Sequence, residues 1–183
     1  MKTEKLYFFT IPGHSNSSEE HWQSIIEREQ KLPIQRINQQ DWYTPNCNQW
    51  ISAIDEHLSG YELSKVVLIG HSLGCTAIIH WLHNYKKKIK AAILVAPPDV
   101  DSQKFQKEIE SVAFTPMPLE KLNCYSVVIA SEDDEWITLE KAKFYSEKWD
   151  SLFITIGKAG HVNATSGYGK WDKIYEIIEN IPD

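Results

Sequence analysis

The amino-acid sequence predicts a three-layer α/β/α fold, in which helices cover both faces of a mostly parallel sheet of about six strands. Two observations carry this prediction. Short runs rich in Val, Ile and Leu alternate along the chain with segments of helical periodicity, which is the pattern of repeated strand–helix–strand units. The chain has 183 residues, 42% of them hydrophobic, and no repeat or linker, so we expect residues 1–183 to form one domain.

The expected strands and helices follow one another in order. We expect strands over residues 6–11, 34–37, 66–69, 91–95, 125–130 and 152–156. We expect helices near residues 19–30, 48–58, 73–84, 102–110 and 138–148, and a last helix over about 170–180. Because crossovers between parallel strands are right-handed, this order predicts a doubly wound sheet that binds ligands at the carboxyl ends of its strands.

The beginning of the chain carries two boundary signals. The apolar run that ends before Pro12 and Gly13 is short, and we interpret it as the first strand rather than as a signal peptide. The segment Ser17-Ser18-Glu19-Glu20 has the pattern of a capping box and predicts the start of the first helix. No apolar stretch approaches the roughly 18 residues that a membrane span needs.

The most informative segment is Gly70-His71-Ser72-Leu73-Gly74, which directly follows the expected strand at 66–69. A G-x-S-x-G sequence between a strand and a helix is the nucleophile elbow of the α/β-hydrolases, whose sharp turn lifts the serine hydroxyl above the sheet. Gly70 and Gly74 have no Cβ to clash with the strand or with the following helix. The sequence therefore predicts an α/β-hydrolase fold with Ser72 as its nucleophile.

A serine nucleophile needs a base and an acid, and in this fold the acid precedes the histidine along the chain. The fifth expected strand ends at the acidic run 132–135, and the sixth leads to His161. Imidazole titrates near neutral pH, so His161 can accept the serine proton and later deliver it to the leaving group. We favour Asp134 as the acid that orients His161, with Asp133 as the second choice and Asp99 as the third.

An acyl-transfer site also needs hydrogen-bond donors for the oxyanion. The helix after the elbow directs its free backbone N–H groups at the site, so we expect the N–H of Leu73 to be one donor. The second donor should come from the loop after the first strand. We expect the N–H of His14 there, with that of Ser15 as the alternative.

Several further segments combine with the elbow into a pattern that spans nearly the whole chain. The pattern consists of Pro12-Gly13, Glu20-His21-Trp22-Gln23, Asp41-Trp42 with Pro45 and Trp50, Gly70-His71-Ser72-Leu73-Gly74-Cys75, Leu94-Val95-Ala96-Pro97-Pro98, Ala130-Ser131-Glu132-Asp133-Asp134, Gly160-His161-Val162-Asn163-Ala164 and Ser166-Gly167-Tyr168-Gly169. It resembles the small serine hydrolases of the retinoblastoma-binding protein 9 and YdeN type, within the α/β-hydrolase superfamily.

The resemblance implies a minimal α/β-hydrolase with a short sheet and little lid. It carries the family's catalytic serine, second aspartate and histidine onto Ser72, Asp134 and His161. Members of this family are described as esterase-like or peptidase-like hydrolases. A proline commonly follows the aspartate pair, whereas this chain has Glu135, which leaves the triad intact, while the resemblance does not fix the shape of this loop.

Seven tryptophans in 183 residues are many for a chain of this size. Trp81 and Trp149 have helical spacing and are expected in the core. Trp22 and Trp42 follow strand ends, and Trp136 comes two residues after Asp134. For these three we favour packing around the sheet, and we keep an apolar substrate pocket as the alternative.

The segment from Asp99 to Glu120 is expected to form a partial cap over the site, because it is rich in apolar residues and follows a strand end. A chain of this length has little material for a deep tunnel. We therefore expect small or medium acyl groups rather than bulky lipids as substrates.

Charge and cysteine content exclude several classes of function. The net charge of −6 argues against a nucleic acid or an anionic membrane as the main partner. Three cysteines without a C-x-x-C pair fit a reducing compartment, with no disulfide framework and no zinc site. We therefore expect a cytoplasmic protein that needs no cofactor or metal.

These observations predict a hydrolase that cleaves a carboxylic ester through a Ser-His-Asp triad and an acyl-enzyme. A thioester or a small amide is the alternative substrate. Two other functions stay open, namely a ligand- or protein-binding module on the same fold and an acyltransferase that uses the same triad. The expected partner is a small ester or acyl compound, and the oligomeric state is not determined by the sequence.

Overall fold

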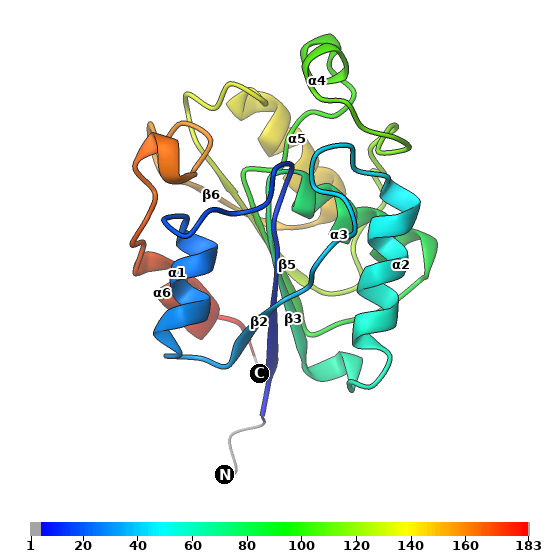
Figure 1. Ribbon diagram of the computed structural model, residues 1–183, viewed down its shortest axis with the longest axis vertical. Coiled ribbons are helices and arrows are strands. Elements are labelled where there is room, and N and C mark those ends of the chain that lie inside the picture. The colour runs from blue at the N-terminus through cyan, green and yellow to red at the C-terminus, as the bar shows by residue number, and fades with distance from the viewer. Residues whose placement is uncertain (1–4, 183) are drawn as a thin grey trace.

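The computed structural model describes residues 5–182 and contains one parallel sheet between two layers of helices (Figure 1). The strands are β1 (Tyr7–Ile11), β2 (Ile34–Arg36), β3 (Val66–His71), β4 (Ala91–Val95), β5 (Tyr125–Ala130) and β6 (Leu152–Thr155). Their order in the sheet is β2-β1-β3-β4-β5-β6, and every neighbouring pair is parallel. The predicted fold class is confirmed.

All the helices described except α4 cover one of the two faces of this sheet (Figure 1). The helices are α1 (Trp22–Glu29), α2 (Cys47–Leu58), α3 (Leu73–Asn84), α4 (Gln103–Glu108), α5 (Leu139–Trp149) and α6 (Lys173–Glu179), with 3₁₀ turns η1 (Leu63–Lys65) and η2 (Ala164–Ser166). Helices α1 and α6 cover one face, and α2, α3 and α5 cover the other (Figure 1). No helix within residues 5–182 has the length and apolar character needed to cross a membrane.

The burial of the central strands β3 and β4 reflects the helix layers on both faces of the sheet. Every residue of β3 and of β4 is buried, which matches the continuous apolar runs expected of strands covered on both faces. Trp81 and Trp149 are fully buried, so their predicted core positions are confirmed. Their indole N–H groups donate to Asp55 (3.1 Å) and to the Pro118 carbonyl (2.8 Å), which satisfies the one polar atom that each ring takes into the interior.

The first helix begins later than the sequence predicts. Helix α1 starts at Trp22, and its N-cap is His21, whose Nδ1 accepts from the Gln23 N–H at 3.2 Å. The predicted capping box at 17–20 is wrong, because Ser17 is buried and its hydroxyl donates to the Gln23 side chain instead. Residues before His21 form a turn closed by a bond from the His21 N–H to the Ser18 carbonyl at 3.1 Å.

Candidate active site

The G-x-S-x-G segment forms a strained turn between β3 and α3. Ser72 has φ 52° and ψ −128°, a conformation that is rare for a residue with a side chain and is typical of functional sites. The two glycines make the turn sterically possible. A Cβ on Gly70 would approach the Cys75 nitrogen at 2.9 Å, and one on Gly74 would collide with the Ile11 carbonyl oxygen at the end of β1.

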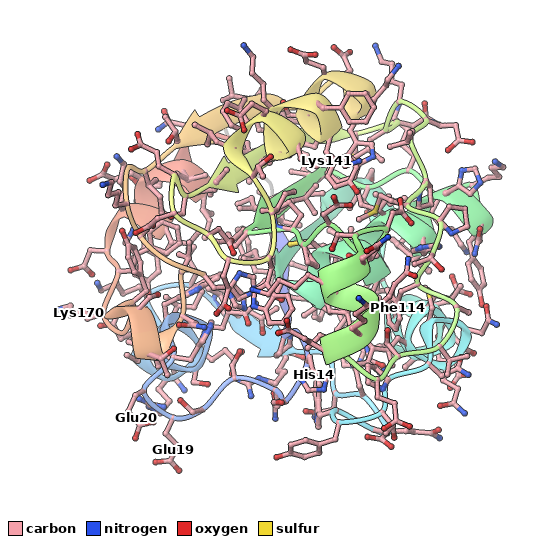
Figure 2. The ribbon with its side chains drawn as sticks, turned by 90° about the horizontal axis from the view of Figure 1, so that it is seen from above. His14, Glu19, Glu20, Phe114, Lys141 and Lys170 are labelled. Carbon is pink, nitrogen blue, oxygen red and sulfur yellow. The ribbon has the colours of Figure 1, made fainter. Side chains whose placement is uncertain are left out.

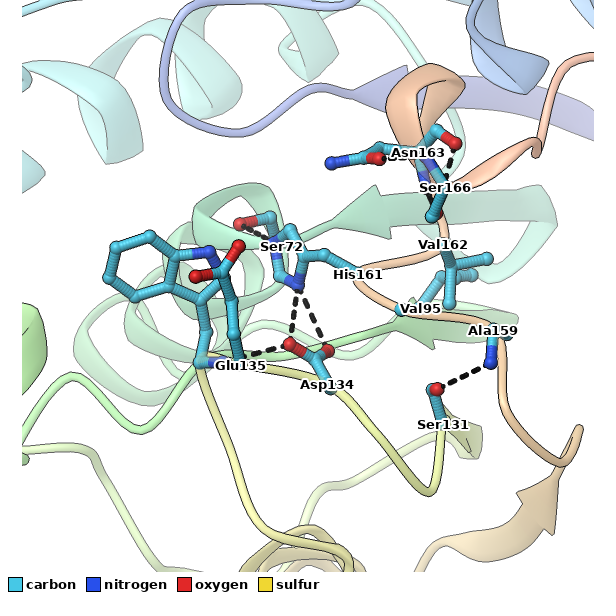
Figure 3. Close-up of polar contacts among 12 residues, drawn as sticks. Ser72, Val95, Ser131, Asp134, Glu135, Ala159, His161, Val162, Asn163 and Ser166 are labelled. Carbon is cyan, nitrogen blue, oxygen red and sulfur yellow. Dashed lines mark hydrogen bonds and ion pairs between the residues drawn. The ribbon is translucent and has the colours of Figure 1, made fainter.

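Ser72, His161 and Asp134 come together at the carboxyl edge of the sheet (Figure 3). The Ser72 Oγ lies 2.7 Å from His161 Nε2. On the other side of the ring, His161 Nδ1 lies 2.9 Å from each carboxylate oxygen of Asp134. An ionised carboxylate only accepts hydrogen bonds, so Nδ1 carries the ring proton and Nε2 is free to accept from the serine hydroxyl.

The burial of these side chains increases from the serine to the acid. Ser72 is half-buried and therefore in contact with solvent, whereas the His161 side chain is 9% exposed and that of Asp134 is 0% exposed. Besides His161, the Asp134 carboxylate accepts from the Trp136 N–H at 2.9 Å. A buried carboxylate with donors on both sides is held in one orientation toward the imidazole.

The other two candidate acids have different partners. One oxygen of Asp133 accepts from the Ser131 hydroxyl and from the Gly160 N–H, both at 2.8 Å. The Gly160 N–H and then the Ser131 hydroxyl hold the pKa of Asp133 below its usual value. Asp99 accepts from the Tyr145 hydroxyl at 2.9 Å, on the side of α5. Of the three predicted candidates, Asp134 is the one that contacts His161.

Residues 159–162, called the His161 loop below, each make a hydrogen bond to another part of the protein through a backbone N–H or carbonyl group. From the loop after β5, Ser131 Oγ accepts from Ala159 N–H at 2.8 Å and Asp133 accepts from Gly160 N–H. From the opposite side, two ring N–H groups donate to carbonyls: His71 Nε2 to His161 (2.8 Å) and Trp22 Nε1 to Val162 (2.9 Å). Sequence reasoning assigned no role to Ser131 or His71, although both adjoin predicted site residues.

The loop after β1 runs directly against the elbow. A Cβ on Gly13 would lie 2.7 Å from the Ser72 Cβ and 3.1 Å from the Leu73 nitrogen. Leu73 is the first residue of α3, where backbone N–H groups have no partner within the helix. The alternative donor Ser15 is excluded, because its N–H already donates to the Trp42 carbonyl at 2.7 Å.

The His14 side chain makes hydrogen bonds to two nearby residues, Tyr43 and Ser15. Its Nε2 donates to the Tyr43 carbonyl at 3.0 Å, and its Nδ1 accepts from the Ser15 hydroxyl at 2.9 Å. Figure 2 views this edge of the sheet from above and labels His14. The ring of His14 is therefore fixed, while its backbone follows Gly13 at the elbow.

The three tryptophans considered for a pocket have different surroundings. Trp22 has no exposed surface, which agrees with the favoured packing role and contradicts the alternative that it lines an open pocket. Trp42 is half-buried and packs edge-on against Trp50 at 5.4 Å. Trp136 is half-buried with its ring centre 6.4 Å from that of His161, which places it beside the candidate site.

Helix α4 belongs to the segment 99–120, which the sequence predicts to cap the site, and it contacts Trp136. Phe105 is its one buried residue and meets the Trp136 ring edge-on at 6.1 Å. Lys104 lies over the same ring, 4.6 Å from its centre, and pairs with the Glu135 carboxylate at 3.0 Å. Helix α4 therefore contacts the loop after β5, residues 131–137 and called the acid loop below, through Trp136 and Glu135.

The buried thiol and histidines near Ser72 are held uncharged. Burial raises the pKa of Cys75 well above its ordinary value, so this neighbour of the elbow is not an activated thiol. Burial lowers the pKa of His71 well below its ordinary value and lowers that of His21 to about 4. Within residues 5–182, no three His, Cys, Asp or Glu side chains form a group that could hold a metal ion.

The fold and this serine-centred arrangement define the class of protein as an α/β-hydrolase, and solved structures agree. A YdeN-like hydrolase from Pectobacterium atrosepticum is 32% identical, with a TM-score of 0.84, covering 97% of this chain and 90% of its own. The ydeN gene product of Bacillus subtilis has a TM-score of 0.83 at 20% identity, covering 96% and 98%. The esterase domain of a Rhodothermus marinus protein shares the fold at 15% identity and a TM-score of 0.65, covering 97% and 86%.

The particular family follows from the sequence. The model of the serine hydrolase family matches residues 8–180. The YdeN hydrolase of Bacillus subtilis aligns over 183 residues at 21% identity, which covers 96% of this chain and 95% of that protein. The chain belongs to the serine hydrolase family, and the predicted membership is confirmed.

Proposed function

We propose that this protein, acting as one domain over residues 1–183, hydrolyses a carboxylic ester of a small or medium acyl group through an acyl-enzyme on Ser72. The observation that carries the proposal is the distance of 2.7 Å between Ser72 Oγ and His161 Nε2, within reach for proton transfer. In this proposal Asp134 orients His161 and stabilises the imidazolium. No metal or cofactor is needed for this chemistry.

The proposed reaction has two halves. Ser72 Oγ attacks the ester carbonyl while its proton passes to His161 Nε2, and the N–H groups of Leu73 and His14 stabilise the oxyanion. His161 then gives this proton to the departing alkoxide, which leaves as the alcohol and leaves Ser72 acylated. A water molecule, deprotonated by His161, attacks the acyl-enzyme in the same way and releases the acid.

The surroundings of Ser72 support a modest substrate. The serine is half-buried rather than enclosed, and five of the six residues of α4 are not buried, so the cap is slight. We propose that Trp136 and Trp42, which are both half-buried, contribute apolar contacts to the substrate. A thioester or small amide fits the same chemistry and is separated from an ester by product analysis.

We also propose that the protein acts in the cytoplasm. The cysteines Cys47, Cys75 and Cys124 are all free. Three cysteines without a disulfide fit a reducing compartment, and burial raises the pKa of Cys47 to about 12, which keeps that thiol protonated. The partner in this proposal is a small ester or acyl compound.

The direct test is covalent labelling of the serine. Purified wild type is incubated with a tagged fluorophosphonate beside Ser72→Ala, and the site of the adduct is mapped by mass spectrometry. We expect labelling at Ser72 and hydrolysis of short-chain esters by wild type, and a loss on the order of 10⁴-fold or more in Ser72→Ala. Unlabelled, folded wild type, or full ester hydrolysis by Ser72→Ala, would overturn the proposal.

A further inference from the structure

Two aromatic N–H groups hold the inner side of the His161 loop. His71 Nε2 lies 2.8 Å from the His161 carbonyl oxygen, and Trp22 Nε1 lies 2.9 Å from that of Val162. A carbonyl only accepts, so the ring proton of His71 resides on Nε2. Both side chains are buried, so these bonds form away from water, where losing a donor leaves a carbonyl unpaired.

The backbone at this place needs such support. Gly160 has φ 54° and Val162 has φ 50°, and the second value is unfavourable for a β-branched residue. The direction of the His161 side chain is set by the peptide groups on either side of its Cα. A rotation of the 161–162 peptide would move Nε2 away from Ser72 Oγ, which is 2.7 Å distant in the structure.

His71 is covalently bonded to Ser72, which makes its bond to His161 different from the other anchors. The last residue of β3 thus connects the strand that carries the nucleophile with the loop that carries the base. Its ring packs 5.1 Å from the His161 ring and 4.6 Å from the His21 ring. Because burial keeps His71 neutral, it does not repel a positive charge that forms on His161.

We propose that His71 is a positioning residue. Together with Trp22 it holds the backbone carbonyls of His161 and Val162 and thereby fixes the imidazole between Ser72 and Asp134. This inference rests on the proposed serine hydrolase function. His71 is the first x of the G-x-S-x-G sequence, a position that the pattern leaves unspecified. The proposal gives this residue a role in orienting the base, through a hydrogen bond that the sequence pattern does not show.

The experiment compares two sets of variants. His71→Leu and His71→Asn remove a donor that can reach the His161 carbonyl, whereas the longer side chain of His71→Gln keeps one. His80 supplies the matched control, since it is also a buried histidine and its Nε2 donates to the Phe114 carbonyl at 3.0 Å, away from Ser72. kcat and KM for a short-chain ester are measured per active site, with fluorophosphonate used to count the sites.

We expect His71→Leu and His71→Asn to lower kcat about 10- to 100-fold, because small errors in the placement of a base have effects of this size. KM should stay within about threefold, since substrate binding is not altered. His71→Gln should recover most of the loss, and His80→Leu should keep kcat within about twofold of wild type. Unchanged kcat in folded His71→Asn, or equal losses in His71→Asn and His71→Gln, would overturn the proposal.

A second readout does not depend on activity. In proton NMR, the Nδ1 proton of His161 that bonds to Asp134 gives a downfield signal, and we expect it to shift or broaden in His71→Asn but not in His80→Leu. An unchanged signal in His71→Asn contradicts the positioning role even if the wild type hydrolyses no ester. Inactive wild type with a shifted signal in His71→Asn instead contradicts the proposed function and leaves the positioning role supported.

Discussion

The His161 loop and helix α4 lie at the same carboxyl edge of the sheet, but they are attached in different ways. All four residues of the loop are hydrogen-bonded to partners from α1, β3 and the loop after β5. Helix α4 buries Phe105 alone, and its ion pair to Glu135 joins side chains that are 40% and 63% exposed. Exposed ion pairs of this kind contribute roughly 0–1 kcal/mol.

This difference in attachment indicates that the His161 loop and α4 have different roles around Ser72. Three of these four hydrogen bonds are buried, those of Ala159, His161 and Val162, and buried bonds resist displacement, so the loop keeps the imidazole in one orientation. A short helix with one buried side chain can shift at little energetic cost, so under the proposed function we expect α4 to adapt to different acyl groups. We therefore expect changes at the loop to alter the rate of reaction, and changes at α4 to leave that rate intact.

The largest effect should come from the two adjacent aspartates on the acid loop. Asp134→Asn should lower kcat about 10³- to 10⁴-fold, because an amide no longer fixes the His161 tautomer or stabilises its charge. Asp133→Asn should lose less than about tenfold, since its amide oxygen can still accept from Ser131 and Gly160. Steady-state ester hydrolysis by the two variants decides between the acids. A larger loss in Asp133→Asn would reverse the assignment.

A pair of serines compares the loop with the helix directly. Ser131→Ala leaves the buried Ala159 N–H without its acceptor and should reduce the free energy of unfolding by about 1–3 kcal/mol, with a lower kcat. Ser102→Ala removes the hydroxyl that accepts from the Phe105 N–H at the start of α4. This change should reduce the free energy of unfolding by about 1 kcal/mol and leave kcat unchanged. Urea unfolding and ester kinetics on both variants test this prediction. Equal losses of activity in Ser131→Ala and Ser102→Ala would contradict it.

The last prediction concerns how the free energy of unfolding depends on pH, through the buried His21 behind the His161 loop. Burial lowers the pKa of His21 to about 4, so the unfolded chain takes up a proton more readily than the folded protein. His21 thus contributes its full stability above about pH 6.5, and this contribution is lost as the pH falls toward about 4. Between pH 7.5 and 5 we expect a loss of about 2 kcal/mol from this residue.

The control for this prediction is His21→Asn, which keeps an acceptor at the N-cap of α1 and removes the titrating ring. Urea unfolding at the two pH values should show a smaller decrease for His21→Asn than for wild type. An equal decrease in both proteins would mean that His21 is not the group responsible.

The sequence determined the fold class and most of the proposed site by itself. Continuous apolar runs predicted the buried central strands, and the chain order of serine, acid and histidine predicted Ser72 and His161, because strand ends of a parallel sheet meet at one edge. The start of α1 was not predicted, because Ser17 bonds to Gln23 rather than capping the helix.

Tertiary structure alone decided which partners meet among residues that look alike in the sequence. Asp133 and Asp134 are adjacent, and the turn of the acid loop directs the first to Gly160 and the second to His161. The bond from Trp22 to Val162 joins residues separated by 140 positions, and no local pattern records it. Local periodicity specifies which face of an element is buried, whereas the direction of a single hydrogen bond depends on how distant elements pack.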